Sequence, residues 1–173
     1  MNRQIKIAVL DMYNGEANQG MRCIYDIINR FNQLVTFQVF DIRGKKEFPD
    51  INKFDIYISS GGPGNPLEGD GNWDVKYFQL IDALWNWNKE NKSKKHVLFI
   101  CHSFQMACKH FGVAEINKRK DTSFGIMTTH KVNDGISDSL FEGLVNPFYT
   151  IDSRDFQVIQ PNLKNLKKMG ASI

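Results

Sequence analysis

Short apolar runs alternate with longer amphipathic segments as far as residue 111 of this 173-residue sequence, and this alternation constrains the fold more than any other feature. Short runs rich in Val, Ile and Phe are typical of buried strands, and apolar residues repeating every three or four positions are typical of helices. Strands that alternate with helices predict a mostly parallel sheet covered on both faces, which is a doubly wound α/β fold. We predict strands over 5–10, 35–40, 54–59 and 97–100, and helices over 15–31, 73–88 and 103–111.

The pattern changes after Val113, where short apolar runs separated by turns follow one another without helices between them. We expect strands over 124–129 and 148–151, and therefore a β-rich C-terminal half. No internal repeat or low-complexity linker divides the chain. Because this length suits one domain with a full core, we predict a single domain over residues 1–173.

Composition and charge argue against several classes of function. The 22 basic and 19 acidic residues leave a net charge of +3, which gives no reason to expect nucleic acid or a membrane as a partner. No apolar run approaches the ~20 residues that cross a bilayer, and the first one is too short for a secretory signal. The three cysteines have neither metal-site nor disulfide spacing, so we predict a cytoplasmic protein with Cys23 and Cys108 buried in helices.

A possible nucleophile follows the fourth predicted strand. Ligands of doubly wound sheets bind beyond the carboxyl ends of the strands, and Cys101 would lie there, where a strand turns into a helix. The helix N-terminus favours the thiolate, and the backbone amide of His102 would lie beside the sulfur. A cysteine that ends a strand can equally be ordinary core packing, which is the alternative reading of this residue.

A glycine-rich loop, Gly61-Gly62-Pro63-Gly64, follows the third predicted strand and should reach the same edge of the sheet. Such a loop can bring a bare backbone N–H close to a reacting carbonyl, although by itself it can be only a turn. One nucleophile and two N–H donors on adjacent strands predict an acyl-transfer site.

Two motifs resemble those of the class I glutamine amidotransferase family, particularly the glutaminase domain of GMP synthase. The segment YISSGGPGNP is similar to that family's oxyanion loop, and LFICHSFQMAC is similar to its nucleophile turn, G-x-C-x-G-H-Q. The resemblance implies a flavodoxin-like fold and a glutaminase in which Cys101 forms a glutamyl thioester. It also implies that Gly62 and His102 donate backbone N–H groups to the oxyanion, and that Gly61 and Gln105 bind the substrate glutamine.

The same resemblance implies a partner and no cofactor. Ammonia released from glutamine has to reach an ammonia-accepting synthetase, as a separate subunit or a further domain, and a GMP-forming synthetase is the one that the resemblance favours. The glutaminase half-reaction requires neither a metal nor an organic cofactor.

The sequence departs from the family at several positions. Phe99 and Ser103 replace the glycines on either side of the cysteine, so we expect an opened or repacked turn, and Phe104 replaces a histidine. No His-x-Glu motif supplies the family's base and its orienting acid. We therefore expect that residues 1–173 lack the segment carrying this motif, and that this chain alone has little or no glutaminase activity.

Two other readings stay open. The Cys101-His102 pair also resembles the PfpI-type family, in which case Glu16, expected early in the first helix, would supply a carboxylate for cysteine hydrolase chemistry. The chain could instead be a non-catalytic amidotransferase-like module that binds a partner, which the non-glycine residues around Cys101 would suit.

Overall fold

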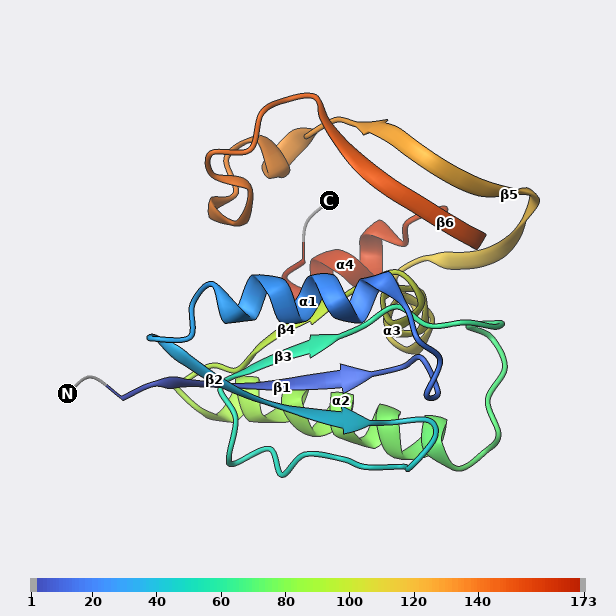
Figure 1. Ribbon diagram of the computed structural model, residues 1–173. Helices are drawn as coiled ribbons and strands as arrows, with labels where there is room; N and C mark the ends of the chain where they lie inside the picture. Colours follow the sequence, from blue (N-terminus) through green and yellow to red (C-terminus); the bar gives the residue numbers. More distant parts are fainter. Residues whose placement is uncertain (1–2, 172–173) are drawn as a thin grey trace. The chain divides into compact units, whose positions relative to one another are not determined.

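The computed structural model describes residues 3–171 (Figure 1). It also describes the side chains of all of these residues except 133 and 134. The chain divides into two compact units, Met1–Ala107 and Cys108–Ile173. The first unit contains the alternating strands and helices that the sequence predicts, and the second contains the β-rich segments. Whether residues 1–173 act as one domain stays a prediction.

A four-stranded parallel sheet forms the centre of the first unit. The strands are β1 (Ile5–Asp11), β2 (Val35–Asp41), β3 (Ile56–Ser59) and β4 (His96–Phe99), in the order β2-β1-β3-β4. Helices α1 (Gln19–Asn29) and α2 (Trp73–Glu90) lie on opposite faces of this sheet, and α3 (His102–His110) follows β4 (Figure 1). The doubly wound α/β prediction is therefore confirmed.

One face of the sheet is covered by α1 because its apolar residues recur at helical spacing. Met21, Ile24 and Ile28 are buried in one cluster with Ile7 and Val9 of β1. Side chains alternate along a strand, so Ile7 and Val9 point to the same face. The contact between these two stripes fixes α1 over β1.

The opposite face is covered by the aromatic and apolar stripe of α2. Trp73, Tyr77, Leu80 and Leu84 are all buried, as their spacing predicts. The Tyr77 hydroxyl is 2.8 Å from the Ser59 hydroxyl of β3 and forms a hydrogen bond with it. This bond satisfies two buried polar groups that would otherwise destabilise the core.

Helix α1 begins four residues later than the sequence pattern predicts. The Asn18 side chain caps the helix by accepting a hydrogen bond from the backbone N–H of Met21 at 2.7 Å. Gly15 lies before this cap with a φ of +77°, a left-handed conformation that a helix cannot contain. Glu16 therefore lies in the loop before α1, and the expectation that it belongs to the helix is wrong.

The second unit is built on two long antiparallel strands, β5 (Glu115–Thr129) and β6 (Phe148–Ile159). They extend the two short strands predicted here, and an irregularity in register lies between Lys118 and Ser123. Two short 3-10 helices, η1 (Asn133–Ile136) and η2 (Ser139–Phe141), lie between the strands, and α4 (Leu163–Met169) follows them.

Two other sequence predictions concern burial and membrane crossing. Cys108 is buried as expected, whereas Cys23 is exposed because it lies on the side of α1 opposite the core residues. Within the part of the chain that the structure describes, none of the helices combines the length and the hydrophobicity needed to cross a bilayer.

The α1 contact can be tested with two adjacent isoleucines. Ile28 is 4% exposed and Ile27 is 56% exposed, so only the first contributes to the core. Ile28→Ala should lower the free energy of unfolding by about 2–5 kcal/mol, whereas Ile27→Ala should change it by about 0.5 kcal/mol or less. Urea unfolding followed by circular dichroism measures both, and equal losses would contradict this placement of α1.

Candidate active site

The backbone of Cys101 adopts an unusual conformation at the turn between β4 and α3. Its φ is +51°, a left-handed value that is uncommon for residues other than glycine. Its carbonyl oxygen accepts a hydrogen bond from the backbone N–H of Gln105 at 3.0 Å, so Cys101 is the residue at which the helical bonding begins. The thiol is exposed. Strained backbone of this kind is concentrated at functional sites, where the surrounding structure holds it in place.

The buried Ser103 side chain stabilises this turn by hydrogen bonds. The side chain is fully buried, and its hydroxyl donates a hydrogen bond to the Ser59 carbonyl of β3 at 2.8 Å. The same hydroxyl accepts from the backbone N–H of Ile100 at 3.0 Å. Ser103 thus ties the turn between β4 and α3 to the neighbouring strand β3.

The glycine loop meets Cys101 and the loop after β1. A Cβ built at Gly61 would lie 3.0 Å from the Tyr13 hydroxyl and 3.5 Å from the Cβ of Cys101. A Cβ at Gly62 would lie 2.5 Å from the carbonyl oxygen of Met12. The structure therefore brings together the loops that follow β1, β3 and β4, and the two glycines allow that approach.

Ser60 fixes the peptide plane between Gly61 and Gly62. Its hydroxyl donates a hydrogen bond to the Gly61 carbonyl at 2.8 Å and accepts one from the backbone N–H of Met12 at 2.9 Å. In a planar trans peptide the N–H of Gly62 points away from the carbonyl of Gly61. The buried Ser60 hydroxyl therefore sets the direction of the Gly62 N–H, the group to which the family resemblance gives the oxyanion role.

Tyr13 belongs to this cluster, although the sequence reasoning did not select it. Its hydroxyl lies 2.6 Å from the position of a Cβ on Gly20, so it fits between α1 and the glycine loop. Burial, followed by the nearby Cys101 and Asp11, raises the pKa of the phenol above its usual value. The hydroxyl consequently keeps its proton at neutral pH and can act as a hydrogen-bond donor at the site. The signal in the sequence is an aromatic residue in the loop that follows the first strand.

The His102 side chain is buried inside the protein. The imidazole is 3% exposed, and its Nε2 has no hydrogen-bond partner among the described residues. Burial, helped by the positive charge of Arg43, lowers the pKa of this histidine to about 4. The side chain is therefore neutral at physiological pH. The position of the His102 backbone amide beside the sulfur stays a prediction.

The other residues selected from the sequence are distributed unevenly. Gln105 lies in the first turn of α3 and is 4% exposed. Glu16 is exposed in the loop before α1. Among the described residues, no group of three or more His, Cys, Asp or Glu side chains could hold a metal ion.

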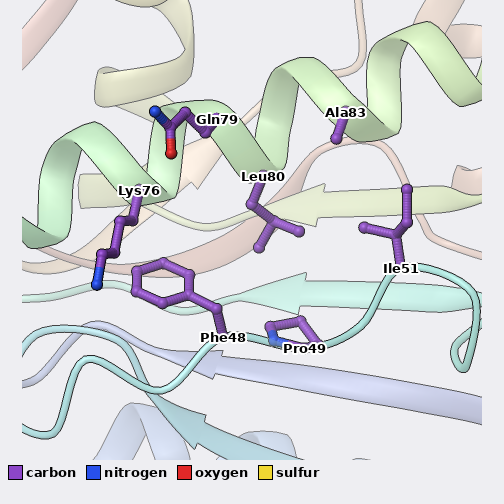
Figure 2. A pocket seen from close by; sticks show the side chains of 7 residues that line it. All are labelled: Phe48, Pro49, Ile51, Lys76, Gln79, Leu80 and Ala83. Carbon is purple, nitrogen blue, oxygen red and sulfur yellow. The ribbon is translucent and has the colours of Figure 1, made fainter.

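A groove of about 520 Å³ lies elsewhere on the first unit (Figure 2). Apolar side chains from α2 and from the connection between β2 and β3 form most of its lining. The lining residues are Phe48, Pro49, Ile51, Lys76, Gln79, Leu80 and Ala83. None of these residues belongs to the three loops around Cys101, so the groove is separate from the candidate active site.

No protein-family profile matches the sequence, and neither does any curated protein. Solved structures do share its fold. A glutamine amidotransferase from Thermotoga maritima matches with a TM-score of 0.73 at 19% identity, over 93% of this chain and 65% of that one. A glutamine amidotransferase from Methylobacillus flagellatus matches with a TM-score of 0.64 at 15% identity, over 92% of this chain and 58% of that one.

These matches concern the fold. The chain has the flavodoxin-like fold of glutamine amidotransferases, as its two motifs predict, and the resemblance to the class I family is confirmed at that level. The chain spans 58–65% of the length of these two structures. The closeness to GMP synthase stays a prediction.

Gly62 is expected to tolerate no side chain. Gly62→Ala should force the Met12 carbonyl away and lower the free energy of unfolding by about 1–3 kcal/mol. Gly135→Ala is the matched control, because a Cβ there would lie 3.8 Å from the Phe141 ring, an ordinary contact. Urea unfolding measures both changes, and equal stability of the two variants would show that the close approach at Gly62 is wrong.

The buried His102 should make stability depend on pH. Its folded pKa of about 4 lies below the ordinary value of 6.5, so between these values the unfolded chain takes up a proton that the folded chain does not. The free energy of unfolding should therefore be highest above pH 6.5. It should fall by on the order of 3 kcal/mol as the pH drops to about 4.

Urea unfolding of the wild type and of His102→Gln between pH 4 and pH 7 measures this effect. The stability of the wild type should fall more steeply toward low pH than that of the variant. Parallel pH profiles would mean that His102 is not buried as a neutral imidazole.

Proposed function

We propose that this chain is a class I glutamine amidotransferase that hydrolyses glutamine through a thioester on Cys101. The observation that carries the proposal is the strained, exposed Cys101 at the start of α3, with Gly61 packed against its Cβ position. A nucleophile beside the bare backbone of a glycine loop is the arrangement that acyl transfer needs.

In the proposed reaction, the Cys101 sulfur attacks the side-chain carboxamide carbon of glutamine. The carbonyl oxygen becomes an oxyanion, toward which the backbone N–H groups of Gly62 and His102 would be directed. Collapse of this intermediate releases ammonia and leaves a glutamyl thioester, and water then hydrolyses the thioester to glutamate. Removing one such N–H donor typically costs ~10²–10³ in rate. Gly61 and Gln105 are proposed to bind the glutamine.

The sequence lacks the motif that supplies the catalytic base of this reaction in the amidotransferase family. No His-x-Glu motif is present, and the buried His102, with its pKa lowered to about 4, is unsuited to take the thiol proton at neutral pH. We expect slow or undetectable glutamine turnover by this chain alone. Covalent labelling of Cys101 is therefore a better test than turnover, because it needs the nucleophile and glutamine binding but no hydrolysis step.

The ammonia produced would pass to a synthetase, and the resemblance of the two motifs favours a GMP-forming one. We propose a cytoplasmic location, with no metal or organic cofactor for the glutaminase step. The PfpI-type alternative is less well supported, because the His102 imidazole is buried and Glu16 lies in an exposed loop.

The test uses a chloroketone analogue of glutamine, with peptide mass spectrometry to locate the adduct. Cys101 should be labelled with saturable kinetics and protected by added glutamine. Cys23 is the internal control for exposure and should react slowly and without saturation. Cys108 should stay unlabelled, because burial raises the pKa of its thiol to about 11. Cys101→Ser should abolish the saturable labelling.

Two outcomes would contradict the proposal. Equal, unsaturated labelling of Cys101 and Cys23 would favour the non-catalytic module. Saturable labelling of Cys101 that glutamine does not prevent, and that Glu16→Gln abolishes, would favour the PfpI-type hydrolase.

A further inference from the structure

We propose that Arg43 is a positioning residue that holds the glycine loop of the candidate site. Arg43 lies in the connection between β2 and β3, outside the motifs that the sequence reasoning selected. Its Nη1 donates hydrogen bonds to the carbonyl oxygens of Pro63 at 2.7 Å and of Met12 at 3.2 Å. One nitrogen thus joins the glycine loop to the loop after β1. The effect of Arg43 on catalysis rests on the proposed glutaminase function. Its effect on the position of the glycine loop does not.

The Met12 carbonyl is the atom against which Gly62 packs. A Cβ at Gly62 would approach this oxygen to 2.5 Å, so its position limits where residue 62 can lie. Arg43 bonds to this oxygen, which contacts Gly62, and also to the carbonyl oxygen of Pro63, the next residue in the chain. With Ser60 fixing the peptide that carries the Gly62 N–H, both ends of this short segment are held.

The guanidinium of Arg43 is itself held between an aromatic ring and the glycine loop. It lies over the Trp73 ring, with its central carbon 5.0 Å from the ring centroid. Its Nη2 lies 3.8 Å from the position of a Cβ on Gly64. The Arg43 Nε is buried and has no hydrogen-bond partner within residues 3–171. Both bonds to the loops therefore come from Nη1, and the rigid guanidinium fixes this donor relative to the ring contact. A lysine ammonium is a flexible point charge and would not fix that distance.

The catalytic consequence concerns the geometry of one N–H donor. A donor stabilises an oxyanion only when it is held at hydrogen-bond distance from the place where the charge develops. Loss of Arg43 should let the glycine loop move, and the Gly62 N–H with it. Attack on a carbonyl should then slow, while the accessibility of the Cys101 sulfur should change little.

The experiment compares Arg43→Lys and Arg43→Met with Lys45→Met. Lys45 is exposed, two residues away, and its replacement removes the same charge without touching the loop. The first readout is labelling of Cys101 by the glutamine chloroketone, whose ketone oxygen would become an oxyanion on attack. Both Arg43 variants should lower kinact roughly 10- to 100-fold, whereas Lys45→Met should leave it unchanged.

Two further readouts separate positioning from general damage. Alkylation of Cys101 by iodoacetamide, which forms no oxyanion at a ketone, should change less than about threefold in all variants. Hydrogen exchange of the peptide covering residues 58–68 should accelerate at least about tenfold in the Arg43 variants, while peptides from α2 keep their protection.

The outcomes distinguish this proposal from the proposed function. Unchanged exchange at 58–68 in Arg43→Met would overturn the role of Arg43, whatever the labelling shows. Full activity of Arg43→Lys in the chloroketone reaction would overturn the requirement for a rigid guanidinium. If the wild type shows no saturable labelling, the glutaminase function fails, and the exchange measurement still decides whether Arg43 positions the loop.

Discussion

A Cβ at position 62 would lie 2.5 Å from the Met12 carbonyl oxygen, so the loop after β3 can reach the loop after β1 only with glycine there. The contact joins backbone to backbone and leaves little freedom to shift, because neither partner is the flexible end of a side chain. The positions of the neighbouring groups follow from this contact: Gly61 against Cys101, and Tyr13 against Gly61. The candidate site is therefore assembled from main chain first, and side chains fill the space that remains.

Buried hydroxyl groups keep this main-chain arrangement in place. Ser59, Ser60 and Ser103 are all fully buried, and the hydroxyl of each has a hydrogen-bond partner within the first unit. A buried polar group without a partner destabilises a fold by a few kcal/mol, so such bonds specify one arrangement of the strands and turns. The left-handed backbone of Cys101 costs about 1–3 kcal/mol, and it persists because the bonds of Ser103 hold the turn on both sides.

The sequence predicts an element correctly where a repeated apolar pattern defines it. It fails where one side chain sets the boundary of the element. The stripes of α1 and α2 are buried as their spacing requires. The start of α1 was misplaced because the Asn18 cap, which no periodicity reveals, ends the preceding loop. The expectation that Cys23 is buried is wrong, because it lies on the face of α1 that points away from β1. Only the packing of α1 against β1 shows which face that is.

For the site, the sequence by itself determined the nucleophile candidate, the glycine loop and their places at the carboxyl ends of strands, since these depend on the order of residues along the chain. The tertiary structure alone decided that Tyr13, Ser60 and Arg43 join them and that the His102 imidazole turns inward. Those contacts connect elements that are distant in sequence, such as Arg43 and Pro63. A hydrogen bond or a stacked ring depends on distances of a few ångströms, and only the packed chain sets those distances.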